Sequence, residues 1–150
     1  MNERKFQPRD TLKPFIESLA INHKRKAGSY KVLPDTGIVV GFQYSGKMAC
    51  LDRGKLVPLQ TAWITGLHDK FKVFKNKEKK KTVLVIFSET GAGAFFKYPM
   101  HKLFGKCVLL QALVPSSQID TIIRLLADAT SDFDRLAIIE GFFINRLNNG

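Results

Sequence analysis

The first two thirds of the chain alternate short apolar runs with polar turns. The turns at 34–37, 44–46 and 52–54 contain Gly together with Pro, Asp or Ser, residues that favour chain reversal. The run at 83–87 is continuously apolar, as expected of a strand covered on both faces. The pattern predicts a meander of strands that forms an antiparallel barrel or sandwich, with strands at 31–33, 38–44, 47–51, 55–59, 61–67, 71–75 and 82–87.

Four apolar side chains ahead of these strands are spaced as on one face of a helix. Pro14 lies near the start of this segment, where its missing amide hydrogen is tolerated. We therefore expect a short helix over residues 11–20, preceded by a polar, mobile arm at residues 1–10. The apolar face of the expected helix consists of Leu12, Phe15, Ile16 and Leu19.

After Pro115 the apolar period changes from two residues to the 3.6 residues of a helix. Ser117 and Ser131 are each followed three residues later by an acid, a capping-box-like pattern in which the serine oxygen accepts an amide hydrogen bond. The pattern predicts two helices, the first packed against the β-structure. Its apolar stripe consists of Ile119, Ile122, Ile123 and Leu126.

The second helix, expected over 132–147, has apolar side chains on more than one side. Ile138 and Phe142 project away from the main face, and one core cannot cover both sides. We therefore predict that these two residues form a homodimer interface; the alternative is that the arm or the first helix covers them. Glu140 falls near the inward face, where it needs a rim position or a cationic partner. The main face consists of Leu136, Ile139, Phe143 and Leu147.

Composition limits the domain organisation and the cellular location. With 150 residues, 45% of them hydrophobic, the chain suits one globular domain. We expect a single domain over 11–150, mainly β with a short N-terminal helix over 11–114 and helical over 115–150. The N-terminus has no apolar secretion signal, and no apolar run approaches membrane-spanning length. We expect a cytoplasmic protein with no membrane partner.

The net charge of +11 favours polyanionic partners. Lysines crowd the segment 70–81 and interleave with Phe71 and Phe74, a combination that single-stranded nucleic-acid binders use. The alternative is a strand, a solvated loop and a second strand, with both aromatic rings in the core. The candidate polyanion contacts are Lys75, Lys77, Lys79, Lys80 and Lys81.

No spacing in the chain indicates catalysis, a metal site or a cofactor. Cys50 and Cys107 lie far apart, and His23, His68 and His101 form no ligand pair. The glycines at 91–93 lack the residues that complete a phosphate-binding loop, so we expect a turn in which backbone approaches backbone. We expect no enzyme, no bound metal and no cofactor.

Three blocks of the sequence together resemble a known family. They are TVLVIFSETGAGAFFKYPMHKLFGKCVLL at 82–110, LPDTGIVV at 33–40 and DRLAIIE at 134–140. The chain thereby resembles the N-terminal sensor and dimerisation domain of bacterial AraC-type transcription regulators. The resemblance implies an α+β fold, a cupin-like antiparallel β-barrel or sandwich followed by two C-terminal helices. It also implies a homodimer and DNA binding through a helix-turn-helix part outside this chain.

A sensor domain of this kind would bind a small-molecule effector. Phe42, Tyr44 and Trp63 lie on expected strands and are the candidate effector-lining residues, although core packing explains aromatic residues equally well. The alternative function is a stand-alone basic nucleic-acid-binding module, for which the charge and the segment 70–81 argue. Steep loss of affinity with salt would distinguish the nucleic-acid module.

Overall fold

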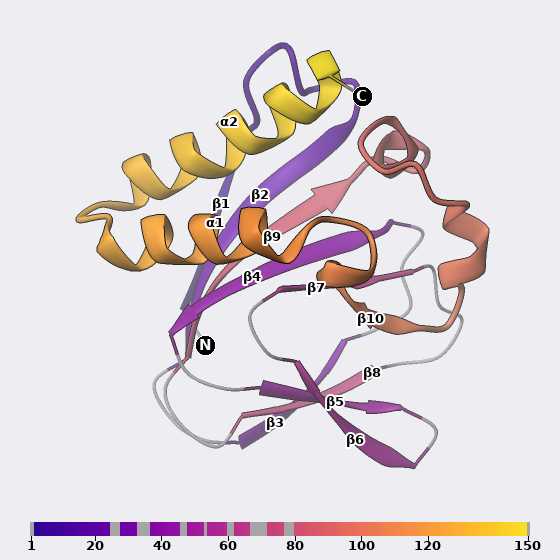
Figure 1. The fold of residues 1–150 in the computed structure, drawn as a ribbon. Helices are drawn as coiled ribbons and strands as arrows, with labels where there is room; N and C mark the ends of the chain where they lie inside the picture. Colours follow the sequence, from indigo (N-terminus) through magenta and orange to yellow (C-terminus); the bar gives the residue numbers. More distant parts are fainter. Residues whose placement is uncertain are drawn as a thin grey trace.

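The computed structural model describes residues 2–24, 28–32, 37–45, 48–52, 54–59, 62–66, 72–76 and 80–149. This part of the chain forms three layers: two helices, a six-stranded sheet beneath them, and a four-stranded sheet on the far side (Figure 1). The helices are α1 (Ser116–Asp128) and α2 (Asp132–Asn149). The strands are β1 (Asn2–Phe6), β2 (Ile16–Lys24), β3 (Gly28–Val32), β4 (Val39–Ser45), β5 (Met48–Asp52), β6 (Lys55–Leu59), β7 (Ala62–Thr65), β8 (Lys72–Asn76), β9 (Lys80–Phe87) and β10 (Cys107–Leu109).

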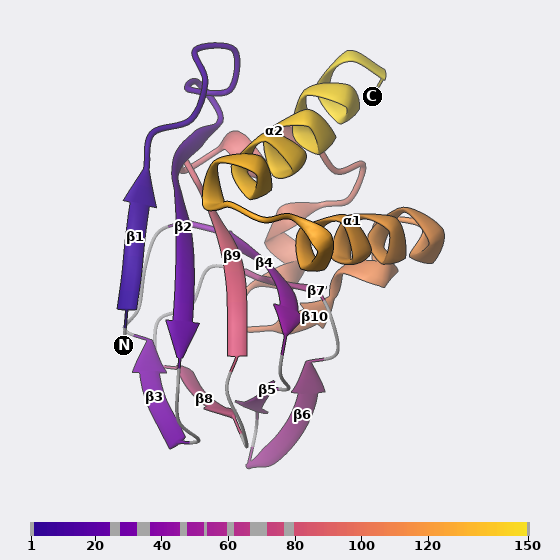
Figure 2. The same ribbon diagram turned by 90° about the vertical axis from the view of Figure 1, so that its left-hand side faces the viewer.

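The larger sheet has the order β1-β2-β9-β4-β7-β10, and the smaller sheet has the order β3-β8-β5-β6. Every strand pair described in them is antiparallel. Figure 2 shows β9 between β2 and β4, so the expected meander is wrong: strands far apart in sequence pair with one another. The expected antiparallel architecture followed by two helices is confirmed. β4 and β9 take central places because their apolar runs can be covered on both faces.

The N-terminal expectations are wrong. Residues 2–6 are not an arm but strand β1, which pairs with β2 from Asn2 opposite His23 to Phe6 opposite Leu19. Residues 10–15 form turns, and β2 begins at Ile16 where a helix was expected. The pairing of β2 with β9 shifts its register between Ile16 and Ser18, and such a bulge adds a residue to the period of two. Of the four apolar residues that suggested a helix, Leu12 and Phe15 lie in the turns before β2. Only Ile16 and Leu19 lie on the strand, where the bulge sets them three residues apart.

An aromatic cluster joins the helices to the six-stranded sheet. The ring of Phe143 on α2 lies 5.6 Å from that of Phe87 on β9 and 6.4 Å from that of Phe42 on β4, both edge to face. All three side chains are fully buried. Rings at these separations and angles are stabilised beyond their area burial, so this cluster fixes α2 against the centre of the sheet.

The face of α2 that packs on the core is broader than expected. Phe142 lies 6.1 Å from the ring of Phe42 and 5.0 Å from that of Phe143, and Ile138 also packs against the core cluster. The premise that both side chains project outward is therefore wrong, because both pack against the core that α2 covers. The homodimer interface itself stays a prediction.

The two capping expectations have different outcomes. Ser131 Oγ accepts a hydrogen bond from the Asp134 amide at 3.1 Å, so the serine-based start of α2 is confirmed. Helix α1 begins one residue before Ser117, after Pro115, and no side-chain bond caps it. Its buried stripe of Ile119, Ile122 and Leu126 is as expected.

Candidate functional site

The candidate effector-lining residues lie on opposite faces of the six-stranded sheet. Side chains alternate between the two faces of a strand. Phe42 and Tyr44 belong to the core cluster on the helix side, together with Ile64 of β7. Trp63 directly precedes Ile64 and therefore projects to the other face, which is turned toward the four-stranded sheet. The structure brings Phe42 and Tyr44 together and separates Trp63 from them.

Trp63 packs flat against the backbone of a neighbouring strand. It pairs in register with Gly41 of β4, and a Cβ atom added to Gly41 would collide with the six-membered ring of the indole. The indole is buried, with 2% of its surface exposed. Only glycine leaves room for this contact, so Gly41 and Trp63 form one unit on the face turned away from the helices.

A row of buried polar side chains lies beside this unit, on the same face. Thr82 of β9 pairs in register with Asn22 of β2 on one side and with Gln43 of β4 on the other. The exposed fractions are 3% for Asn22, 1% for Thr82 and 2% for Gln43. We call these three residues the inner polar row. Sequence reasoning missed the row, although a glutamine between Phe42 and Tyr44 in an apolar run was a signal.

Two members of the inner polar row carry unused hydrogen-bonding groups. Within the described residues, neither Oε1 nor Nε2 of Gln43 has a hydrogen-bond partner, and Thr82 Oγ1 has none. Buried polar groups in folded proteins are almost always hydrogen-bonded, and leaving one unsatisfied costs about 1–3 kcal/mol. The row therefore places a donor and acceptors on the face of the six-stranded sheet that is turned toward the four-stranded sheet.

Tyr44 connects the opposite face of the same strand to the helices. The guanidinium carbon of Arg135 lies 4.8 Å from the centre of the Tyr44 ring. Arg135 also donates to the carbonyls of Leu126 at 3.1 Å and Ala129 at 2.7 Å, and pairs with Asp132 at 3.0 Å. Burial raises the pKa of Tyr44, opposed by the positive charge of Arg135. Arg135 thus ties the end of α1 and the start of α2 to β4.

Glu140 has a specific partner in the N-terminal segment. Its Oε2 accepts a hydrogen bond from the Arg9 amide at 2.8 Å, and its Oε1 lies 3.5 Å from Arg9 Nε. The carboxylate is thus buried on α2 with both an amide and a cation beside it, which meets the expected need for a partner. This contact also anchors the segment that precedes β2.

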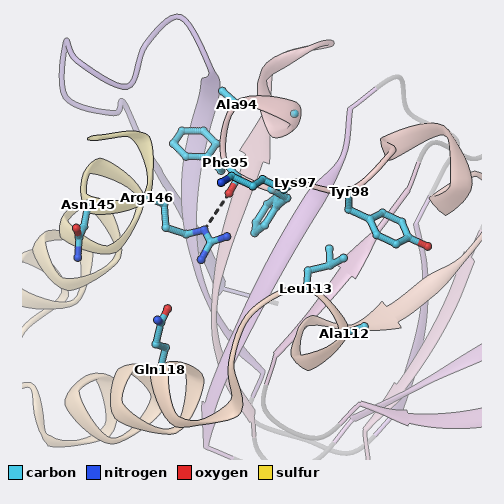
Figure 3. A pocket seen from close by; sticks show the side chains of 11 residues that line it. Ala94, Phe95, Lys97, Tyr98, Ala112, Leu113, Gln118, Asn145 and Arg146 are labelled. Atoms are coloured by element: carbon cyan, nitrogen blue, oxygen red, sulfur yellow. Dashed lines mark hydrogen bonds between the residues drawn. The ribbon is translucent and has the colours of Figure 1, made fainter. Parts of the chain in front are cut away.

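A pocket of about 680 Å³ lies on the helix side of the molecule. It is bounded by the end of α2, the start of α1 and the segment around the 3-10 helix η1 (Gly91–Ala94) (Figure 3). The expected close backbone approach at this glycine turn is confirmed, because a Cβ on Gly91 would collide with the carbonyl oxygen of Phe15. The polar side chains of the lining are Lys97, Tyr98, Gln118, Asn145 and Arg146.

The candidate polyanion contacts are described only in part. Lys75 lies on β8, Lys80 begins β9, and the Lys81 side chain is exposed. Lys77 and Lys79 lie outside the described residues. The structure therefore places Lys75 in the four-stranded sheet and Lys80 and Lys81 in the six-stranded sheet, and it does not test their role.

The histidines do not converge in the described part of the chain. His23 and the hydroxyl of Tyr44 are hydrogen-bonded at 3.3 Å, and His101 is exposed; His68 lies outside the described residues. Over the described ranges no group of three or more His, Cys, Asp or Glu side chains could hold a metal ion. Neither α1 nor α2 is long and apolar enough to cross a membrane.

Comparisons place this geometry among known proteins. Residues 4–109 match the family model described as "Domain of unknown function (DUF6597)". The Cupin_2 domain of an XRE-family transcriptional regulator from Enterobacter cloacae is 16% identical, with 58% of this chain and 95% of that chain covered and a TM-score of 0.46. ToxT from Vibrio cholerae is 12% identical, with 87% of this chain and 54% of that chain covered and a TM-score of 0.46. No curated protein matches the chain.

A third similar structure is a Thermotoga maritima protein described as a predicted oxalate decarboxylase. It is 11% identical, with 57% of this chain and 77% of that chain covered and a TM-score of 0.43. The similar structures thus include a cupin domain of a transcriptional regulator, in line with the expected cupin-like fold. At these identities the likeness concerns the fold alone.

Proposed function

The chain belongs to the family described as "Domain of unknown function (DUF6597)", and we propose that it is the effector-sensing and dimerisation domain of an AraC-type transcription regulator. DNA would be bound by a helix-turn-helix part outside this sequence. The domain itself would carry out no catalysis. Its two tasks would be to bind a small molecule and to hold two chains together in a cytoplasmic regulator.

The observation that carries the effector part is the inner polar row. Gln43 and Thr82 are buried yet hold polar atoms without a partner in the described residues, on the face between the two sheets. A bound molecule would supply the missing hydrogen bonds. The row contains no charged side chain, and the indole of Trp63 lies beside it, so the effector would be a neutral molecule with both donors and acceptors. Among the candidate lining residues, this assigns Trp63 to the site and Phe42 and Tyr44 to its support.

A signal from this site has a physical route to the helices. Gln43 is flanked on β4 by Phe42 and Tyr44, which contact Phe143 and Arg135 of α2 respectively. A ligand that shifts β4 would therefore act on the position of α2. Because Ile138 and Phe142 lie on the same helix, a dimer formed through α2 would respond to the effector.

The test of effector binding uses thermal unfolding with a panel of monosaccharides and free nucleosides as neutral probes. A ligand that binds only the folded state raises the melting temperature. We expect at least one probe to do so for the original protein and not for Gln43→Met. If no member of the panel stabilises the protein, or if Gln43→Met is stabilised equally, the inner polar row is not the effector site.

Dimerisation and regulation are tested by fusing residues 1–150 to a monomeric helix-turn-helix domain. Repression of a reporter with two half-sites requires paired chains, so we expect repression by the fusion and none by the helix-turn-helix domain alone. Phe142→Asp in the fusion should abolish this repression. Because Phe142 also packs on Phe42, the folded fraction of this variant must be verified by circular dichroism. A monomer in light scattering at high protein concentration would contradict the dimer.

The second candidate function is a stand-alone nucleic-acid-binding module, favoured by the net charge of +11. Its affinity for a single-stranded oligonucleotide would fall steeply with salt as counterions are released. Replacing Lys80 and Lys81 by Gln would reduce that salt dependence. Binding that persists at physiological salt would favour this function over the regulatory domain.

A further inference from the structure

The pocket of Figure 3 is separate from the inner polar row. It lies on the helix side, where the last turns of α2 approach the segment at 93–98 and the first turn of α1. Its volume of about 680 Å³ falls within the ~300–1,000 Å³ of small-molecule sites. Residues from distant parts of the chain, such as Lys97, Gln118 and Arg146, line it together.

Arg146 is held in a fixed orientation at this pocket. Its Nε donates a hydrogen bond to the Phe95 carbonyl oxygen at 2.9 Å. Its guanidinium carbon lies 5.3 Å from the ring centre of Phe96 and 5.7 Å from that of Phe142. Figure 3 shows its terminal nitrogens directed into the space between α2 and Gln118. A guanidinium has five N–H donors, and the single hydrogen bond that Arg146 makes within the described part of the chain leaves those of Nη1 and Nη2 for a ligand.

The pocket contains positive charge without a counter-charge. Arg146 and Lys97 belong to the lining, and no lining residue is acidic. The ion pairs of the described residues are formed by Arg4, Arg9, Lys13 and Arg135, and not by Arg146. Burial lowers the pKa of Arg146, which reflects the cost of removing the cation from water. An anion bound here would offset that cost.

The remainder of the lining is suited to an apolar group. Leu113 is half-buried and Ala112 lies beside it. Tyr98 also belongs to the lining, with its ring directed away from Arg146. The side-chain amide of Gln118 faces the pocket from α1. An arginine fork matches the planar geometry of a carboxylate and can bind both its oxygens. The apolar surface distinguishes this site from one for a bare inorganic anion.

We propose that this pocket binds a small organic acid, whose carboxylate pairs with Arg146 and whose apolar part lies against Ala112 and Leu113. This site goes beyond the effector site at the inner polar row, because it takes an anion and uses none of the same residues. Arg146 also has a structural role, since it joins α2 to the Phe95 carbonyl. The test must separate ligand binding from that role.

Calorimetric titration of the full chain uses three probes. These are 3-phenylpropionate, its neutral analogue 3-phenylpropanamide, and inorganic phosphate. We expect only the carboxylate to bind, and we expect Arg146→Gln to weaken it about tenfold or more, as for loss of a charge-assisted hydrogen bond. Arg124→Gln is the matched control. Arg124 is exposed on α1, so this substitution removes the same charge outside the pocket.

Two further variants keep the test independent of folding. Lys97 is exposed, so Lys97→Gln should weaken binding by less than Arg146→Gln without affecting stability. A Cβ on Gly93 meets no atom within 4 Å, so Gly93→Leu should obstruct the pocket while Arg146 keeps its contacts. The proposal is overturned if 3-phenylpropionate fails to bind at millimolar concentration, if the amide or phosphate binds equally well, or if neither Arg146→Gln nor Gly93→Leu weakens binding.

Discussion

Replacing the inner polar row by apolar residues of similar shape should stabilise the protein. Gln43→Met removes two buried polar atoms that have no partner in the described residues, and Thr82→Val removes one. Methionine is close to glutamine in length, and valine is close to threonine in shape, so neither change requires the sheet to repack. The prediction is unusual because most buried substitutions destabilise a protein.

The size of the effect follows from the number of unsatisfied groups. Each buried donor or acceptor without a partner costs about 1–3 kcal/mol, and this cost disappears when the group is replaced by an apolar one. Gln43 is only 2% exposed and Thr82 only 1%, so solvent does not compensate either of them. We expect Gln43→Met to raise the free energy of unfolding by about 1–3 kcal/mol and Thr82→Val by about 1 kcal/mol.

Urea unfolding followed by circular dichroism measures these changes, and thermal unfolding provides a second readout. For a domain of this size, each kcal/mol raises the melting temperature by about 2–4 °C. Gln7 and Thr130 are exposed, so Gln7→Met and Thr130→Val are matched controls in which no stabilisation is expected. Gln43 and Thr82 are register partners, so the effects of a double variant need not add.

A loss of stability in Gln43→Met would refute the reasoning. It would mean that the amide is hydrogen-bonded in the folded protein, and that the row is an ordinary structural network. A gain in stability together with loss of probe binding would instead identify a site where stability is sacrificed for ligand recognition.

Three further predictions test the supporting structure. Gly41→Ala should destabilise the protein by about 1–3 kcal/mol through overpacking against Trp63, and the fluorescence of this single tryptophan should shift; an unchanged emission spectrum and stability would contradict the contact. Glu140→Ala should cost about 1–3 kcal/mol in urea unfolding, because the Arg9 amide loses its acceptor, whereas Glu140→Gln should cost less. Burial raises the pKa of Tyr44, so the folded state retains this proton to higher pH than the unfolded state. The stability that this proton contributes is therefore fully present below the ordinary tyrosine pKa of about 10, and it is lost as the pH rises through the pKa of Tyr44 in the folded state. Tyr44→Phe should remove this part of the alkaline pH dependence of unfolding.

The amino-acid sequence determined the elements that have a long apolar pattern and clear turn or cap signals at their ends. β4 and β9 follow from their apolar runs and from the turns that bound them, and α2 follows from the 3.6-residue period and the serine at Ser131. The segment 11–20 was misread because its helix-like spacing combines two residues of the turns at 10–15, Leu12 and Phe15, with Ile16 and Leu19 of β2, which the bulge sets three residues apart. No local rule distinguishes this spacing from that of a helix, and only pairing of β2 between β1 and β9 decides the outcome.

Tertiary structure alone decided which side chains share a site. Asn22, Thr82 and Gln43 become neighbours through the register of three strands that are distant in sequence, and alternation then separates Trp63 from Phe42. In the same way Arg146 reaches the Phe95 carbonyl only because α2 folds back over the sheet. Hydrophobic periodicity fixes the face on which a residue lies within its own element, whereas strand order and helix docking fix what that face meets.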